Sequence, residues 1–228
     1  MTTHLVTGAG SGIGAATARR LSARGDELIV LARNADRAQD LVADFAGSRT
    51  VVADLADPSS LASALSDQLP PALDSVIHVA GVVDLGAVAE MSPDLWQRTI
   101  EVNLLAPAEL TRICLPALRE ARGHVVFVNS GSGLHAGPRW GAYAASKHAL
   151  RALGESLRAE ESGNGVRVSS IYPGRVATAM QRKVHEQEGR DYDPAEWIDP
   201  ESVATAIVTA LDLPRDAEIT DLSVRPGP

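Results

Sequence analysis

The feature that most constrains how this chain folds is a regular alternation of short apolar runs with longer segments of helical periodicity. Such alternation is typical of repeated strand–helix units, in which each helix returns the chain so that successive strands lie parallel. The apolar runs expected to be strands are His4–Thr7, Glu27–Leu31, Thr50–Ala53, Ser75–Val79, His124–Asn129, Val166–Tyr172 and Ile219–Val224. The expected helices are Gly12–Arg24, Ala35–Phe45, Pro58–Gln68, Pro93–Glu120, Gly141–Glu160 and Pro200–Leu211.

No Gly/Ser-rich or Pro-rich linker divides this pattern, so residues 1–228 are expected to form one α/β domain. We expect a doubly wound parallel sheet of about seven strands with helices on both faces. Only the polar stretch from Ala179 to Ile198 breaks the rhythm. Because it follows a strand end, where ligands bind in open α/β sheets, we interpret residues 179–198 as a mobile substrate lid, with a plain surface insertion as the alternative.

Charge and cysteine content exclude several classes of function. The formal net charge of -8 repels phosphate backbones and anionic lipids, so neither nucleic acid nor membrane is an expected partner. The single cysteine, Cys114, lies in an apolar helical run and is expected to be a buried structural thiol. There is no CxxC spacing, basic-then-apolar leader or long apolar run, so we expect no metal site and a cytoplasmic location.

A glycine-rich turn, Thr7-Gly8-Ala9-Gly10-Ser11-Gly12-Ile13-Gly14, lies between the first expected strand and helix. Glycines at this junction permit a tight turn and let backbone N–H groups approach a pyrophosphate, which predicts a dinucleotide site. The residues expected to form it are Gly8, Ser11, Gly12, Ile13 and Gly14. The TGxxxGxG spacing resembles the short-chain dehydrogenase/reductase family, which implies a Rossmann fold and an NAD(P) cofactor.

The end of the second expected strand, Ala32-Arg33, bears on which cofactor is used. NAD-selective sites place a carboxylate here to bind the ribose 2′-hydroxyl. A guanidinium instead bonds a 2′-phosphate with two parallel donors, so Arg33 favours NADP(H), with NAD(H) possible. The alternative is that Arg33 is a solvated loop arginine.

Other cofactor contacts follow from the family resemblance alone. The resemblance assigns Asp54 and Leu55 to the adenine ring, Ala80 and Gly81 to the floor beneath the cofactor, and Pro173, Gly174, Val176 and Thr178 to the nicotinamide end. Thr178 as a simple helix cap is the competing interpretation. His78 stands where the family usually has asparagine, and a structural role is expected for it.

Asn103 is singled out by the proline four residues after it. Pro107 has no N–H to donate to the carbonyl of residue 103, so the helix must kink or open there. In the family, the matching asparagine uses this carbonyl to hold a water that contacts the catalytic lysine. The alternative is a kink needed only for packing.

The catalytic candidates are Ser130, at a strand end, and the pair Tyr143 and Lys147, which are four apart on one helix face. Hydride transfer to a carbonyl leaves an alkoxide that needs a proton, and the reverse reaction needs a base. A phenol with a pKa of about 10 is a poor base near neutrality, and a nearby ammonium stabilises its phenolate. The resemblance implies Tyr143 as acid/base and as a cofactor contact, Lys147 as its partner and ribose ligand, and Ser130 as donor to the substrate oxygen. Ser146 is expected to pack.

These residues predict an NADP(H)-dependent oxidoreductase that acts on a carbonyl or secondary alcohol. Two alternatives stay open: a non-catalytic cofactor-binding or regulatory protein, and a nucleotide-sugar epimerase or dehydratase, which shares YxxxK. A mostly apolar substrate pocket is expected to include Leu134, His135, Trp140 and Met180. The resemblance also implies a homodimer or homotetramer through the two long helices, and because Pro228 closely follows the last strand, no tetramer contact from a C-terminal extension is expected.

Overall fold

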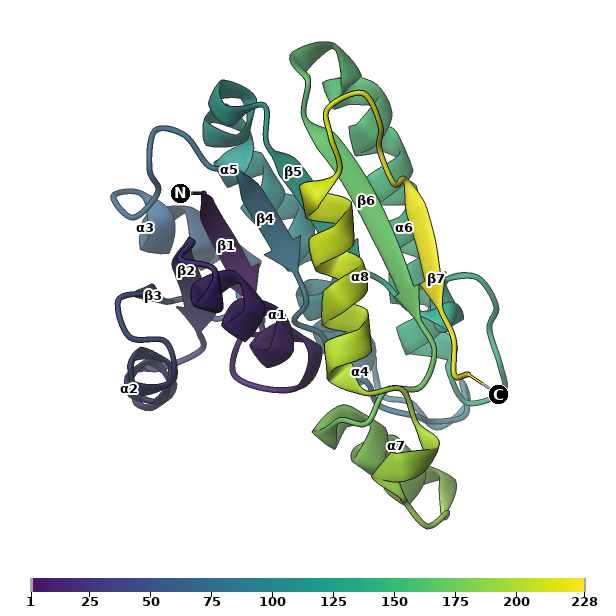
Figure 1. Cartoon of the computed structure of the whole chain (residues 1–228). Helices are drawn as coiled ribbons and strands as arrows, with labels where there is room; N and C mark the ends of the chain where they lie inside the picture. The colour runs from purple at the N-terminus through teal and green to yellow at the C-terminus, as the bar shows by residue number, and fades with distance from the viewer. Residues whose placement is uncertain (1, 228) are drawn as a thin grey trace.

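The computed structural model describes residues 2–227 and contains one sheet of seven parallel strands (Figure 1). Their order across the sheet is β3-β2-β1-β4-β5-β6-β7, which confirms the predicted doubly wound sheet. The strands are β1 (Thr3–Thr7), β2 (Glu27–Ala32), β3 (Arg49–Val52), β4 (Ser75–His78), β5 (His124–Val128), β6 (Arg167–Pro173) and β7 (Asp221–Val224). Since the chain order reverses between β1 and β4, the carboxyl ends of these strands border the crevice where such sheets bind ligands.

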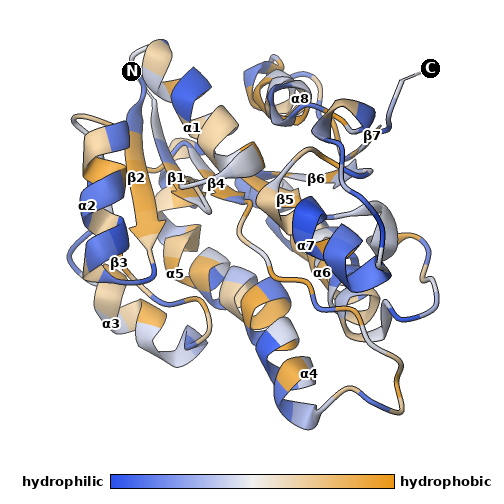
Figure 2. Ribbon diagram, turned by 90° about the horizontal axis from the view of Figure 1, so that it is seen from below, coloured by the Kyte–Doolittle hydropathy of each residue, from blue (hydrophilic) through white to orange (hydrophobic). Residues whose placement is uncertain are grey.

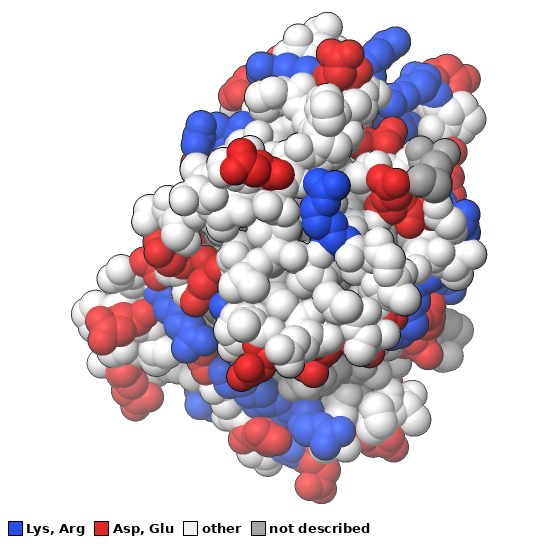
Figure 3. Space-filling model, turned by 90° about the vertical axis from the view of Figure 1, so that its left-hand side faces the viewer, with Lys and Arg blue, Asp and Glu red and all other residues white. Residues whose placement is uncertain are grey.

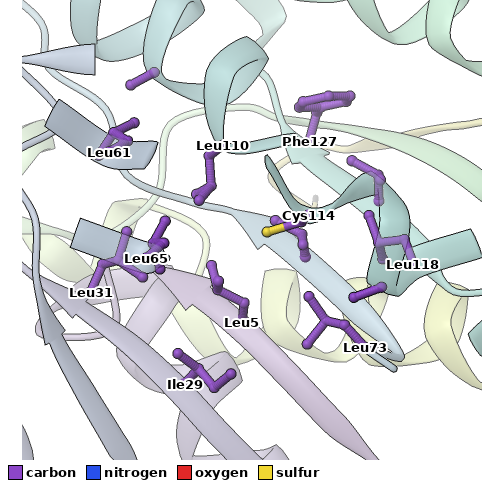
Figure 4. Close-up of a cluster of buried hydrophobic side chains, with 14 of the residues drawn as sticks. Leu5, Ile29, Leu31, Leu61, Leu65, Leu73, Leu110, Cys114, Leu118 and Phe127 are labelled. Carbon is purple, nitrogen blue, oxygen red and sulfur yellow. The ribbon is translucent and has the colours of Figure 1, made fainter. Parts of the chain in front are cut away.

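Helices cover both faces of the sheet because its central strands carry apolar side chains on both sides. On one face lie α1 (Gly12–Ala23), α2 (Ala35–Asp44) and α8 (Pro200–Asp212), which pack on strand residues such as Val6 and Ile77. On the other face lie α3 (Leu61–Leu65), α5 (Ala106–Ala121) and α6 (Gly141–Glu161). Figure 4 shows part of this second core, in which Leu110, Cys114 and Leu118 of α5 meet Leu5 and Phe127 of the sheet.

The hydropathy colouring in Figure 2 follows this layering, with orange strands at the centre and helices that are blue on their outer sides. Cys114 is fully buried, as predicted, and burial raises the pKa of its thiol to about 12. Among residues 2–227, no helix combines the length and apolar character needed to cross a membrane.

Two predicted helices differ from the structure. The expected helix Pro58–Gln68 is a 3₁₀ turn, η1 (Pro58–Ser60), followed by the short α3. Asp57 occupies the cap position but accepts a hydrogen bond from Ser59 Oγ, at 2.6 Å, instead of capping the backbone. The expected helix Pro93–Glu120 is divided into α4 (Pro93–Ile100), a π-helical turn η2 (Glu101–Leu105) and α5.

The π-helical turn η2 lies where Pro107 was expected to open the helix. A widened turn shifts the hydrogen-bonding register by one residue, which accommodates a position that lacks an N–H. Asn103 is at the centre of η2 and is 1 % exposed. The prediction that the helix is interrupted at Asn103 is therefore confirmed.

The stretch 179–198, expected to be a mobile lid, is largely ordered secondary structure: α7 (Ala179–Glu188) and the short turn η5 (Pro194–Glu196). Its ends return to one place, since Val176 and Ile198 form a parallel bridge. Within the segment, the buried His185 ring packs edge-on against Tyr192 and Trp197, with ring centroids 5.3 and 5.2 Å apart. Figure 1 shows α7 beyond the carboxyl edge of the sheet, where the lid was expected.

Helix α7 is fastened to the loop after β4 through Asp84. This carboxylate pairs with Lys183 Nζ at 2.5 Å and accepts a hydrogen bond from Gln187 Nε2 at 3.1 Å. Gln187 Oε1 accepts from Leu85 N at 3.0 Å, and Lys183 Nζ also donates to the carbonyl of Val83 at 3.0 Å. We refer to Asp84, Lys183 and Gln187 as the α7 clasp.

Three buried histidines are part of the sheet: His4 on β1, His78 on β4 and His124 on β5. His78 stacks on Phe127 at 5.0 Å and is 2.9 Å from Thr111 Oγ1, which is the structural role expected for it. Burial, reinforced by the charge of Lys147, lowers the pKa of His78 to about 3. Burial also lowers the pKa of His124 to about 3, and it lowers that of His4.

We predict that these imidazoles make the fold less stable as the pH falls from 7 to 5. The folded protein keeps them neutral, whereas the unfolded chain takes up protons below pH 6.5, so His78 and His124 each cost about 2 kcal/mol of unfolding free energy over this interval. Urea unfolding followed by circular dichroism at several pH values measures the slope. His124→Asn makes it shallower, while His148→Gln, on the exposed surface of α6, leaves it unchanged. A pH-independent unfolding free energy between pH 7 and 5 would contradict this account.

Candidate active site

A cavity of about 700 Å³ opens at the carboxyl edge of the sheet, bordered by the loops that follow β1 through β6. Every residue predicted to contact the cofactor lines it: Gly8, Ser11, Gly12, Ile13, Gly14, Arg33, Asp54, Leu55, Ala80, Gly81, Tyr143, Lys147, Pro173, Gly174, Val176 and Thr178. Ser130 lines it as well, whereas Asn103 lies behind its wall, next to Val102. Residues from widely separated parts of the chain are thus brought together at one site.

Backbone conformation and close contacts both require glycine in the glycine-rich turn. Gly8 has φ +72° and Gly12 has φ +51°, both in the left-handed region that disfavours side chains. A Cβ on Gly8 would lie 2.9 Å from Ala80 N, and one on Gly12 would lie 2.9 Å from Thr178 Cγ2. The turn therefore passes closely between two other loops and leads straight into α1, whose first residues line the cavity; a helix N-terminus is a common site for a pyrophosphate.

Two arginines lie at the end of this cavity that is bordered by the loop after β2. Arg33 follows β2 and is exposed, with part of its surface lining the cavity. Arg37, one turn into α2, also lines it; its Nη2 bonds the Gly10 carbonyl and its Nη1 pairs with Asp40 at 2.8 Å. Sequence reasoning missed Arg37, although its spacing of four from Arg33 across a helix start would have placed both at one end of α2.

The side chain of Asn103 braces the cavity from behind. Its Oδ1 accepts from Val82 N at 2.8 Å, and its Nδ2 donates to Val82 O at 2.9 Å and to Ser146 Oγ at 3.0 Å. Ser146 is fully buried, as expected, and donates in turn to the carbonyl of Tyr143 at 2.7 Å. A Cβ on Gly81 would lie 3.2 Å from Asn103 Oδ1, so a side chain there would disturb this brace.

The three catalytic candidates converge on one wall of the cavity. Ser130 follows β5 in an extended conformation, and its Oγ accepts from Ser132 N at 3.1 Å. Tyr143 and Lys147 project from adjacent turns of α6, with Lys147 Nζ 5.8 Å from the centroid of the Tyr143 ring. Lys147 Nζ donates to the carbonyl of Val128 at 2.9 Å, which fixes the ammonium beneath the end of β5.

Burial sets the protonation of Tyr143 and Lys147. It raises the pKa of the Tyr143 phenol, and a hydrogen bond with Ser130 opposes the rise. It lowers the pKa of the Lys147 ammonium to about 8, so this group is mostly charged at neutral pH. In this structure desolvation outweighs the hydrogen bond with Ser130, so the pKa of the Tyr143 phenol lies above its ordinary value.

The cavity is basic although the chain is acidic overall. Its lining includes Arg33, Arg37, Arg98, Lys147, Arg175 and Arg225, against one carboxylate, Asp54. On the outer surface, by contrast, residues of both signs are mixed, as the face in Figure 3 shows. Such a site attracts anions within a protein of net charge -8.

The substrate end was predicted only in part. Trp140 and Met180 line the cavity as expected, but Leu134 and His135 do not. Val83 and Val184, which were not predicted, form a small buried cluster with Tyr143. Thr178 is both a cavity residue and a helix cap, since its Oγ1 accepts from Gln181 N at 3.2 Å; the two interpretations are therefore compatible.

Comparison with known proteins supports the geometry. A family model described as short chain dehydrogenase matches residues 2–189. Dehydrogenase/reductase SDR family member 7B of Bos taurus is 36% identical over 225 residues, covering 91% of this chain and 69% of that protein. The fold of the present chain matches the closed form of serine dehydrogenase complexed with NADP+ (TM-score 0.87, 25% identity, covering 98% of this chain and 94% of the other). It also matches 4-hydroxyisoleucine dehydrogenase complexed with NADH (TM-score 0.85, 27% identity, covering 100% and 98%).

The family model spans most of the chain, and its range contains the glycine-rich turn, Asn103, Ser130 and the Tyr143–Lys147 pair. The matched structures were solved with NADP+ in one case and NADH in the other. The chain belongs to the short-chain dehydrogenase/reductase family of NAD(P)-dependent oxidoreductases.

Proposed function

We propose that this protein transfers a hydride between NADP(H) and a carbonyl or secondary alcohol substrate, with Tyr143 as the general acid and base. The observation that carries the proposal is the convergence of Ser130, Tyr143 and Lys147 on the cavity that the glycine-rich turn also lines. The names of the two matched structures, dehydrogenases of serine and of 4-hydroxyisoleucine, both hydroxyl-bearing amino acids, agree with alcohol chemistry.

The bound nicotinamide would supply or accept the hydride, and the protein's part is to hold the substrate oxygen and move its proton. Because burial raises the pKa of Tyr143, the phenol keeps its proton at neutral pH and can donate it to the alkoxide formed by carbonyl reduction. Lys147, charged below a pKa of about 8, would stabilise the phenolate that remains. Ser130 would donate to the substrate oxygen, and Lys147 would also bond the nicotinamide ribose.

Asn103 is proposed to act through position and not through contact with substrate. Its side chain holds the loop after β4 against α6, and η2 brings its main chain close to the helix that carries Lys147. We propose that its carbonyl holds a water next to Lys147 Nζ, through which a proton reaches the phenolate.

The proposed preference for NADP(H) rests on Arg33 and Arg37. Two guanidinium groups lie at the adenosine end of the cavity, and Ala32 occupies the position where a carboxylate would select NAD. A 2′-phosphate placed between them would gain charge-assisted hydrogen bonds that a 2′-hydroxyl lacks.

We also propose a homodimer or homotetramer assembled through α4–α5 and α6. Leu95 on α4 and Leu105 at the end of η2 are large apolar side chains that are 38% and 47% exposed, and a helical interface would cover them.

We expect Tyr143→Phe to lower kcat/KM by about 100- to 10,000-fold, because it removes the proton donor and leaves the ring in place. NADPH binding, measured by fluorescence titration, stays as in the unmodified protein. The matched control is Tyr172→Phe, which also loses one hydroxyl. Tyr172 is not part of the cavity lining, and its hydroxyl donates to Asp221. Unchanged turnover in Tyr143→Phe would favour a regulatory cofactor-binding protein.

We expect Arg33→Gln to weaken NADPH binding by about 10- to 100-fold and to leave NADH binding unchanged, because only the 2′-phosphate loses a charged partner. Arg215→Gln is the control: it removes the same charge from an exposed residue near Gly165, outside the cavity lining. If the unmodified protein bound NADH more tightly than NADPH, the role given to Arg33 would be wrong.

A further inference from the structure

Arg225 reaches the cavity from the tail that follows the edge strand β7. The carbonyl of Val224 accepts a hydrogen bond from Gly174 N at 2.8 Å, which fastens the end of β7 beside the loop after β6. Pro226 crosses Gly174 so closely that a Cβ there would lie 3.1 Å from Pro226 Cδ. These two contacts direct Arg225 over the strand ends toward the catalytic wall.

The guanidinium of Arg225 lies against Gly131, the residue after Ser130. A Cβ on Gly131 would come within 2.7 Å of Arg225 Nη1, so the absence of a side chain at this position makes room for the arginine. Arg225 lines the same cavity as Ser130, Trp140, Tyr143 and Met180. It is thus at the substrate end, with β6, β5, β4 and β1 between β7 and the strand that leads to Arg33.

Arg225 has no protein counter-charge within residues 2–227: no carboxylate comes within ion-pair distance of it, and it donates to no acceptor. Among residues 2–227, Arg33 and Arg98 also line the cavity outside any ion pair, whereas Arg37 and Arg175 differ in this respect. Arg37 pairs with Asp40, and Arg175 pairs with Glu188 at 2.6 Å and lies over the Trp197 ring. In a chain with more acidic than basic residues, an arginine that faces a cavity unpaired is available to an anion.

We propose that Arg225 binds a carboxylate of the substrate, which makes the substrate a short hydroxy acid or keto acid. This rests on the proposed function and adds the substrate class to it. A guanidinium matches a carboxylate with two parallel hydrogen bonds, and it would hold the acid while the carbonyl or hydroxyl carbon faces Ser130 and Tyr143. Trp140, Met180 and Val184 line the same cavity with apolar side chains, which suit a short aliphatic chain between the two polar ends.

The test uses the full chain with NADPH and a series of short keto acids, whose carboxylate is separated from the ketone by zero to three methylenes, alongside their neutral methyl esters. NADPH oxidation gives kcat/KM for each, and any compound that is not reduced is tested as an inhibitor. We expect at least one acid to be preferred over its ester. Arg225→Gln lowers kcat/KM for that acid, or its strength as inhibitor, by about 10- to 100-fold and leaves the ester unchanged. Arg225→Lys keeps part of the preference because it keeps the charge.

Arg215→Gln, which removes the same charge outside the cavity lining, keeps the full preference for acids. NADPH affinity is measured for each variant and is expected to be equal in all of them. The inference fails if no acid is preferred over its ester, if Arg215→Gln loses the preference equally, or if Arg225→Gln loses NADPH affinity instead. The proposed function is judged separately, by reduction of the neutral esters and its loss in Tyr143→Phe.

Discussion

The hydrogen bonds of the Asn103 side chain hold together the parts of the molecule on which the cavity depends. The buried amide of Asn103 forms hydrogen bonds with both the N–H and the carbonyl of Val82, in the loop after β4. It also donates to Ser146, in the helix that carries Tyr143 and Lys147. It can do so because Pro107 prevents a regular helix and η2 takes its place, which turns Asn103 inward. One residue therefore links the floor of the cavity to its catalytic wall, and both polar atoms of its side chain form hydrogen bonds with the protein.

Burial and charge oppose each other throughout this site. The parallel sheet and its helices remove Tyr143 and Lys147 from water, which favours the neutral form of each, and the hydrogen bonds to Ser130 and Val128 only partly compensate. These two groups are buried at a free-energy cost, and the other charged groups that line the cavity are mostly positive. An anionic ligand would relieve the repulsion among those charges, so ligand affinity and the reactivity of the phenol arise from the same arrangement.

Local rules of chain geometry predicted much of this molecule. The glycines of the first turn, the proline after Asn103 and the four-residue spacing of Tyr143 and Lys147 act over one or two turns of chain, and the structure shows the expected turn, interruption and shared helix face. Contacts across the sheet were beyond such rules. The approach of Arg225 to Gly131 depends on the pairing of β7 with β6 and on the path of the tail, and nothing near either residue reveals it. The place of segment 179–198 after a strand end predicts a ligand-facing lid but not its helix α7, which is held by the buried His185 and by the distant Asp84.

The α7 clasp has a consequence for the thermodynamics of binding. A disordered lid must be immobilised when a ligand enters, and the lost conformational entropy is subtracted from the affinity. Here α7 is already helical, capped by Thr178 and held by Asp84, so most of that ordering is complete once the chain has folded. Ligand binding therefore need not include the entropic cost of folding α7, and affinity would depend on contacts within the cavity.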